Sequence, residues 1–202
     1  MVTDNYAKIT RENLIRLYAS LPGDLAENLP ARREGDRFVF NAFGHPCAIS
    51  PEGVHFGGGD FPSVLGILVS LYALNARPDG CLELPFRAFK EIPDSRPYVG
   101  AFSTHTEQVL VPHVAAIRKN SDRIRDALNG REAGPEVGGD FALIVYPLPK
   151  IALCYIFYMA DEDFPAGVTC LYSGNARLFL PVDALADVGE YTSKRMVEVI
   201  HS

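Results

Sequence analysis

Residues Phe141–Met159 read FALIVYPLPKIALCYIFYM, and this stretch decides the fold. Two apolar runs, 141–146 and 151–159, flank a Pro-Leu-Pro turn. Short apolar runs that are rich in β-branched and aromatic residues and separated by turn residues are typical of neighbouring buried strands. The stretch therefore predicts an antiparallel hairpin. Its second strand is apolar on both faces, so we expect it in the centre of a sheet, with 168–172 as a third strand.

The chain ahead of the hairpin predicts helices and a small meander. An amphipathic helix is expected over 4–20 and a short helix over 24–29. Alternating apolar residues and turn sequences predict three strands, over 38–43, 46–49 and 54–56. The helix expected over 63–76 is apolar on nearly every face. We expect this helix to be the central core helix and to pack against the hairpin.

The remaining segments complete the fold class. Residues 82–102 are rich in proline and aromatics, and predict an irregular segment around a helical turn at 87–90. Further helices are expected from 103 or 104 to 118 with a kink at Pro112, over 120–129, and from 181 to about 200, where Gly189 is a candidate interruption. The order of helix, strands, helices, strands and helix predicts an α+β fold, with antiparallel β-hairpins and a meander packed against several helices in a single domain, 1–202.

Composition excludes several classes of protein. The chain has 202 residues, 48% hydrophobic and 22% charged, which is typical of a globular domain. A net charge of −6 argues against binding to nucleic acid or to anionic lipid. The most apolar stretch, 64–74, is shorter than the roughly 20 residues that span a bilayer, and no secretory signal is expected. The cysteines at 47, 81, 154 and 170 form no Cys-x-x-Cys pair, so we expect reduced thiols, a cytoplasmic location and no iron–sulfur cluster held within the chain.

Several stretches together resemble a prokaryotic family, domain of unknown function 3786. They are residues 67–72, 89–93 with Tyr98, 139–140, 147–149, 161–166 and 179–183. The most specific is Asp161-Glu162-Asp163-Phe164-Pro165. The resemblance implies no activity, but relatives look like this domain fused to a cysteine-rich iron–sulfur module in iron–sulfur or corrinoid proteins of anaerobes. This chain lacks that module, lacks the aromatic that the family often carries ahead of residue 86, and has Ser173 where the family often has an aspartate.

An acidic triplet, Asp161-Glu162-Asp163, directly follows the predicted central strand. Carboxylates at the end of a strand can bind a metal ion through oxygen or supply an acid and a base. The alternative is a charged turn in which aspartate caps backbone amides. Three adjacent residues on an extended chain cannot all face one point, so we favour the turn.

A second group of polar residues is Arg87, Lys90 and Glu91, to which Asp140 could be added. Together they could recognise an anion. The alternative is a network of ion pairs that holds an irregular, proline-rich loop in place, and we favour this alternative. The seven residues of the two groups form the candidate functional cluster.

Other motifs are weaker. His45, Cys47 and His55 could bind a soft metal, but too few ligands are present to make a site. The glycines at 57–59 precede a helix, yet they lack the Gly-Lys-Ser/Thr ending of a phosphate-binding loop. Neither a metal ligand set nor a catalytic set is assigned, and the cofactor is unknown.

The leading functional hypothesis is a cytoplasmic, non-catalytic binding or accessory module linked to anaerobic iron–sulfur or corrinoid metabolism, with a protein partner or a small-molecule ligand. The alternative is an enzyme that uses carboxylates, and a divalent metal where one is bound, on a small molecule. A third hypothesis is a self-associating protein with exposed aromatics in 82–102. A pocket that joins the seven candidate residues would favour the enzyme.

Overall fold

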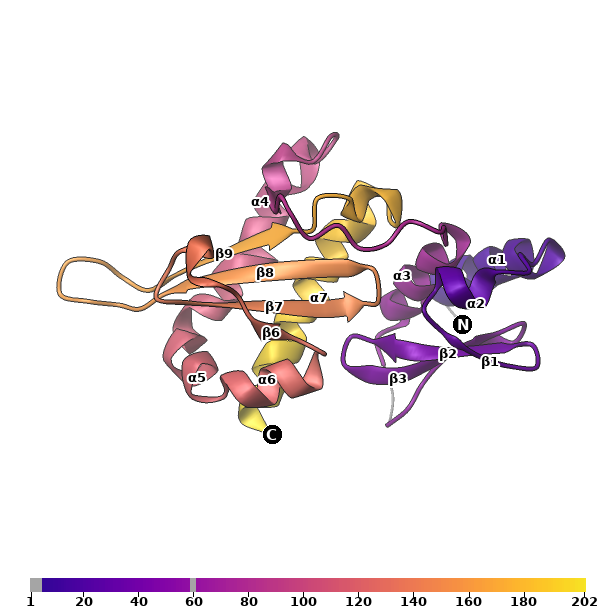
Figure 1. Ribbon diagram of the computed structural model, residues 1–202, viewed down its shortest axis with the longest axis horizontal. Helices are drawn as coiled ribbons and strands as arrows, with labels where there is room; N and C mark the ends of the chain where they lie inside the picture. The colour runs from indigo at the N-terminus through magenta and orange to yellow at the C-terminus, as the bar shows by residue number, and fades with distance from the viewer. Residues whose placement is uncertain (1–4, 59–60) are drawn as a thin grey trace.

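A computed structural model of the chain describes residues 5–58 and 61–202. It contains helices and two antiparallel sheets, which confirms the predicted α+β fold (Figure 1). The predicted first residue of the first helix, Asp4, and the end of the glycine loop, Gly59-Asp60, lie outside the described residues. No helix within the described ranges is long and apolar enough to cross a bilayer.

The first sheet is a four-stranded meander in which every strand is antiparallel to its neighbour along the chain. Its strands are β1 (Arg32–Glu34), β2 (Arg37–Ala42), β3 (His45–Ser50) and β4 (Gly53–Phe56). The last three confirm the prediction, whereas β1 was missed because all three of its residues are exposed and polar. The turn between β2 and β3 requires Gly44: its φ is +76°, and a Cβ there would lie 2.4 Å from the carbonyl oxygen of Ala127.

Helices α1 (Asn5–Ala19) and α3 (Ser63–Leu74) pack against each other beside the meander, with the short α2 (Leu25–Asn28) nearby (Figure 1). Gly66 of α3 permits their close approach, because a Cβ on it would lie 3.0 Å from Oγ1 of Thr10. A buried hydrogen bond of 3.0 Å, from Nδ2 of Asn13 to Oγ of Ser70, fixes the register of the two helices.

The second sheet has five antiparallel strands in the order β5-β9-β8-β7-β6. They are β5 (Arg87–Ala88), β6 (Arg131–Glu132), β7 (Phe141–Leu148), β8 (Ile151–Tyr158) and β9 (Gly167–Tyr172). The hairpin of β7 and β8 confirms the prediction made from 141–159. In β8 every residue except Tyr158 is buried, as expected of a central strand.

The helical segments between β5 and β6 are shorter than predicted. Around one face of the second sheet run α4 (Val99–Phe102), a π-helical turn η3 (Ser103–Glu107), the 3₁₀ turn η4 (Gln108–His113), α5 (Val114–Lys119) and α6 (Ser121–Ala127). Single 3₁₀ turns occur at η1 (Phe89–Glu91), η2 (Arg96–Tyr98), η5 (Pro135–Val137) and η6 (Ala176–Leu178). Pro112 lies inside η4, because proline has no N–H and cannot continue an α-helical hydrogen-bond pattern.

The structure corrects the prediction that the hairpin packs against the 63–76 helix, because α3 packs mainly on α1 and β4. The helix α7 (Val182–His201) crosses the sheet instead (Figure 1), and it continues through Gly189 without interruption. Two tyrosine hydroxyls fix it there: Tyr155 donates to the carbonyl of Gly189 at 3.3 Å, and Tyr172 donates to that of Leu185 at 2.6 Å. The main partners of α3 are α1 and β4.

The two sheets share one continuous buried core, which contains Phe38 of the first sheet, Leu68 of α3 and Tyr155 of the second sheet. Two polar contacts join the same two halves. The N–H of Phe43 donates to the carbonyl of Pro147 at 2.6 Å, and Nζ of the buried Lys150 donates to the carbonyl of Arg77 at 2.5 Å.

Candidate functional site

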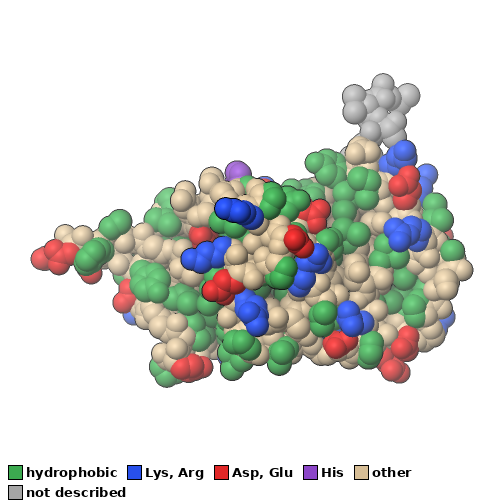
Figure 2. Space-filling view, turned by 90° about the horizontal axis from the view of Figure 1, so that it is seen from above, with side chains coloured by type: hydrophobic (Ala, Val, Ile, Leu, Met, Phe, Trp, Pro, Cys, Tyr) green, Lys and Arg blue, Asp and Glu red, His purple; other side chains and the backbone are tan. Residues whose placement is uncertain are grey.

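The acidic triplet forms the tip of the hairpin between β8 and β9, which projects beyond the sheet (Figure 1). Oδ1 of Asp161 accepts hydrogen bonds from the backbone N–H groups of Asp163 (2.9 Å) and Phe164 (2.7 Å). The N–H of Asp161 donates to the carbonyl of Phe164 at 3.0 Å. Acidic and hydrophobic side chains are exposed at this tip (Figure 2), and Phe164 is 70% exposed. Asp161 therefore acts as the backbone cap of a charged turn.

Asp140 stabilises the base of the same hairpin. Its N–H donates to the carbonyl of Phe157 at 2.9 Å, and its Oδ2 accepts the N–H of Met159 at 2.6 Å. The carboxylate thus adds one hydrogen bond to a backbone N–H beyond the last residue pair of β7 and β8.

The remaining candidates, Arg87, Lys90 and Glu91, lie at the other end of β9. Arg87 pairs with Tyr172, whereas the tip follows on from the β8–β9 pairing at Gly167. Five residues of strand separate these positions, which is about 17 Å at a rise of about 3.3 Å per residue. Oε2 of Glu91 accepts the N–H of Ala88 at 3.2 Å, so it too caps a turn.

The seven candidate residues therefore do not converge on one pocket. Within residues 5–58 and 61–202, no three His, Cys, Asp or Glu side chains form a group that could hold a metal ion. The arrangement offers no shared pocket to an enzyme based on these carboxylates.

The histidines and cysteine of the meander are also separated. Cys47 is buried in the core, and burial raises the pKa of its thiol to about 12. His55 pairs with Ala48, one position along from the Cys47–Phe56 pair, so His55 and Cys47 face opposite sides of the sheet. The ring of His45 contacts Phe61 edge-on at 4.7 Å, and burial, followed by the charge of Arg195, lowers its pKa.

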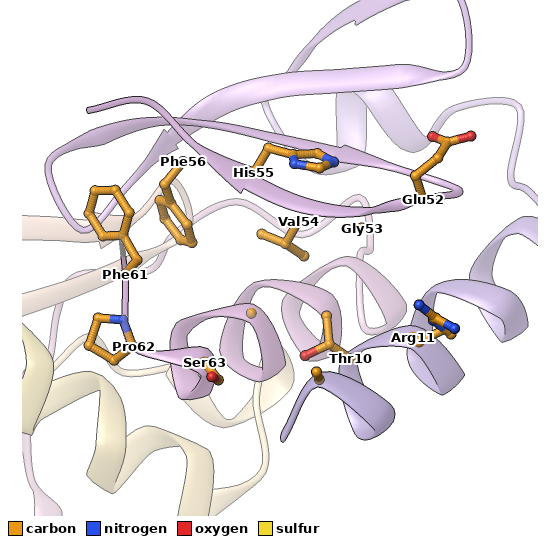
Figure 3. A pocket seen from close by; sticks show the side chains of 12 residues that line it. Thr10, Arg11, Glu52, Gly53, Val54, His55, Phe56, Phe61, Pro62 and Ser63 are labelled. Atoms are coloured by element: carbon orange, nitrogen blue, oxygen red, sulfur yellow. The ribbon is translucent and has the colours of Figure 1, made fainter. Parts of the chain in front are cut away.

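A cavity of about 450 Å³ lies between α1, the β3–β4 turn with β4, and the start of α3 (Figure 3). We call it the α1–β4 groove. It is lined by Ala7, Thr10, Arg11, Glu52, Gly53, Val54, His55, Phe56, Phe61, Pro62, Ser63 and Gly66. None of these belongs to the seven candidate residues, so the sequence did not predict the groove.

The groove has an apolar end and a polar end. Phe56 and Phe61 lie at the apolar end (Figure 3), with ring centroids 4.8 Å apart and planes tilted by 32°. Arg11 and Glu52 lie at the other end (Figure 3). A hydrogen bond to Ser50 is the main reason that the pKa of Glu52 is lowered, so this carboxylate is ionised at neutral pH.

A second cavity, of about 330 Å³, adjoins the groove and shares Phe61 and Pro62 with it. Its far wall is α7, through Tyr191, Lys194, Arg195 and Glu198. Both of its cations are engaged on α7 itself: Lys194 with Glu190 at 2.6 Å, and Arg195 with Glu198 at 3.1 Å.

The groove was missed because its residues come from three segments with no common motif. Of the residues that line it, only His55 is a candidate ligand in the sequence, and then only as a weak metal ligand. Two glycines that line the groove, Gly53 and Gly66, are the sequence features that could have indicated it. Small residues often mark a close approach of chain segments.

Comparison with known proteins places the chain in a family. No curated protein and no solved structure matches it. A family model described as a domain of unknown function (DUF3786) matches residues 22–195, which includes both sheets and most of α7. The chain therefore belongs to the DUF3786 family.

Proposed function

We propose that this chain is a non-catalytic binding module and that the α1–β4 groove is its ligand site. The observation that carries the proposal is the groove itself. Its volume of about 450 Å³ lies within the usual range for small-molecule sites, which runs from about 300 to 1,000 Å³. Aromatic walls with a few polar groups are the usual lining of such sites. The dispersal of the candidate carboxylates supports a binding role over a catalytic one.

We place this module in the cytoplasm because its cysteines form no Cys-x-x-Cys pair and no secretory signal is expected. We link it to anaerobic iron–sulfur or corrinoid metabolism because some relatives in the family look fused to modules of those systems. An accessory role suits the cysteines, because all four are free and Cys47, Cys154 and Cys170 are buried. The groove suits a metabolite-sized ligand better than a whole corrinoid macrocycle. The cluster or corrinoid would then be held by a partner.

The test uses phenylnaphthylamine, an uncharged dye that fluoresces on entering apolar sites. We expect saturable binding to the wild-type protein. Ala7→Trp places a large side chain in the groove and should abolish binding. Ile15→Trp is the matched control, because Ile15 is 59% exposed on the same helix and does not line the groove. Equal binding by both variants, or none by the wild type, would contradict the proposal.

A protein partner is a second candidate, favoured by the exposed Phe164 at the β8–β9 tip. Three hydrogen bonds between Asp161 and residues 163–164 order the tip, so little conformational entropy remains to be lost on docking. Exposed aromatic anchors commonly dominate binding at interfaces. A photo-crosslinking residue at position 164 should capture one discrete partner in cells. The same residue at position 178, where Leu178 is 40% exposed, is the control and should not.

Self-association through the 82–102 segment remains a prediction. Its exposed large hydrophobic side chains are Leu82 (55%), Leu84 (63%) and Tyr98 (37%). Gel filtration of the wild type and of a Leu82→Ser, Leu84→Ser double variant tests it. A dimer that the double variant dissociates would support self-association.

A further inference from the structure

We infer that the α1–β4 groove selects small organic anions that carry a flat, apolar body. This inference rests on the proposed ligand-binding function and names the chemical class of the ligand. It is carried by the positive charge of Arg11 at the polar end and by the aromatic pair at the apolar end.

Arg11 supplies the positive charge. In the part of the chain that the structure describes, its guanidinium forms no ion pair. The sequence of α1 explains this. The side chains three and four positions away are Lys8, Ala7, Leu14 and Ile15, none of which is acidic. The adjacent Glu12 is engaged with Lys8 at 3.8 Å.

The aromatic pair sets the shape of the ligand body. Phe56 and Phe61 form one end of the groove, and Val54 points from β4 toward the helices between that end and Arg11 (Figure 3). A planar ring can stack against such a wall, and stacking adds about 0.5–1.5 kcal/mol beyond buried area. A ligand that is apolar at one end and anionic at the other therefore matches both ends of the groove.

Glu52 opposes this selection, because it is ionised and lies at the same end as Arg11. The second cavity competes less well for an anion, since Lys194 and Arg195 are already paired with glutamates. Two opposite effects follow. Reversal of the charge at Arg11 should weaken anion binding, and neutralisation of Glu52 should strengthen it.

The experiment compares two dyes of similar shape in the full-length protein. Anilinonaphthalene sulfonate is a planar anion, and phenylnaphthylamine is its uncharged analogue. Arg11→Glu should raise the dissociation constant of the sulfonate about tenfold, because an attraction is replaced by a repulsion of similar size. It should change that of the uncharged dye by less than about twofold. Glu52→Gln should tighten the sulfonate about two- to threefold.

Arg16→Glu is the matched control, since it makes the same charge change at an exposed site on α1 outside the groove. Equal weakening of the sulfonate by Arg11→Glu and Arg16→Glu would overturn the inference. Equal loss of both dyes in Arg11→Glu would overturn it too, and either result would leave the proposed function intact. Absence of saturable binding of both dyes to the wild type would instead reject the proposed function.

Discussion

Replacement of Gly189 by alanine should destabilise the protein, although alanine is the better helix former. Gly189 lies in the interior of α7, where the helix crosses the π-helical turn and the second sheet. A Cβ at this position would lie 2.7 Å from Cε2 of Phe102, 2.8 Å from Oγ1 of Thr106 and 2.8 Å from the hydroxyl of Tyr172. All three distances are shorter than a normal van der Waals contact, so the neighbours must move.

The magnitude follows from two opposing terms. Gly to Ala in a helix interior gains about 1 kcal/mol through helix propensity. Overpacking of a close-packed core costs about 1–3 kcal/mol. The upper part of this range applies, because Phe102, Thr106 and Tyr172 are buried, and the hydroxyl of Tyr172 is held by Leu185 at 2.6 Å. We expect a net loss of about 1–2 kcal/mol in the free energy of unfolding.

Urea unfolding followed by far-ultraviolet circular dichroism measures this loss. The control is Gly100→Ala in α4, where nothing lies within 4 Å of the new methyl group. That variant should gain up to about 1 kcal/mol. If both glycines gave the same stabilisation, the packing of α7 on the π-helical turn would be refuted, and with it the position of α7 across the sheet.

Three further predictions concern titration, thiol reactivity and the junction of the two halves. Burial, then the charges of nearby carboxylates, raises the pKa of Asp187. The contribution of Asp187 to stability is therefore complete below its unfolded pKa of 3.8 and is lost as pH rises through its folded pKa. Asp187→Asn should raise the free energy of unfolding at pH 7 by less than about 1 kcal/mol, and it should have no such effect near pH 3. An aromatic disulfide reagent should modify the half-exposed Cys81 first, and the three buried thiols should react only in urea. Burial raises the pKa of Cys154 to about 11, so a first reaction at Cys154 would contradict the fold. Lys150→Met removes the hydrogen bond to Arg77 and should lower the urea midpoint by the equivalent of about 1–2 kcal/mol, whereas an unchanged midpoint would show that this contact does not hold the halves together.

The fold was predictable where hydrophobic periodicity was strong. The hairpin of β7 and β8, the meander and the C-terminal helix all carry long apolar patterns, and all are present. The strands β1, β5 and β6 have only two or three residues, most of them exposed, so they carry no such pattern. They are defined by pairing with a neighbour, and a sequence read locally does not contain that information.

The choice of partner for the central hairpin was not predictable for a related reason. Both α3 and α7 offer an apolar surface, and α3 has the more uniformly apolar sequence. Because α3 is apolar on nearly every side, it can be buried by α1 and the meander as well as by a sheet. The decisive contacts of α7 are polar, from Tyr155 and Tyr172 to backbone carbonyls, and composition gives no sign of them.

The candidate site was also hard to predict from local sequence. Clustered acids suggested a functional site, yet in Asp161, Asp140 and Glu91 a carboxylate oxygen accepts a hydrogen bond from a backbone N–H group. Turn formation was the favoured interpretation of the acidic triplet, and the geometry of Asp161 agrees with it. The α1–β4 groove arises from the meeting of α1, β4 and α3, so it exists only at the level of packing.

Two candidate binding features lie at opposite ends of the long axis: the groove beside α1, and the β8–β9 tip (Figure 1). The tip has no structural need for an aromatic residue, because the Asp161 hydrogen bonds that order it involve only backbone groups of residues 163 and 164. Leaving Phe164 70% exposed forgoes most of the roughly 2 kcal/mol that burial of such a side chain provides. Stability of the folded chain therefore does not explain Phe164, and this is the reason to propose a protein contact at the tip. Since the two features share no residues, Phe164→Ser should leave dye binding in the groove unchanged, and Arg11→Glu should leave crosslinking at the tip unchanged. A module with two independent sites could bind a ligand in the groove while a partner binds the β8–β9 tip. A change in dye binding in Phe164→Ser, or in crosslinking in Arg11→Glu, would contradict that independence.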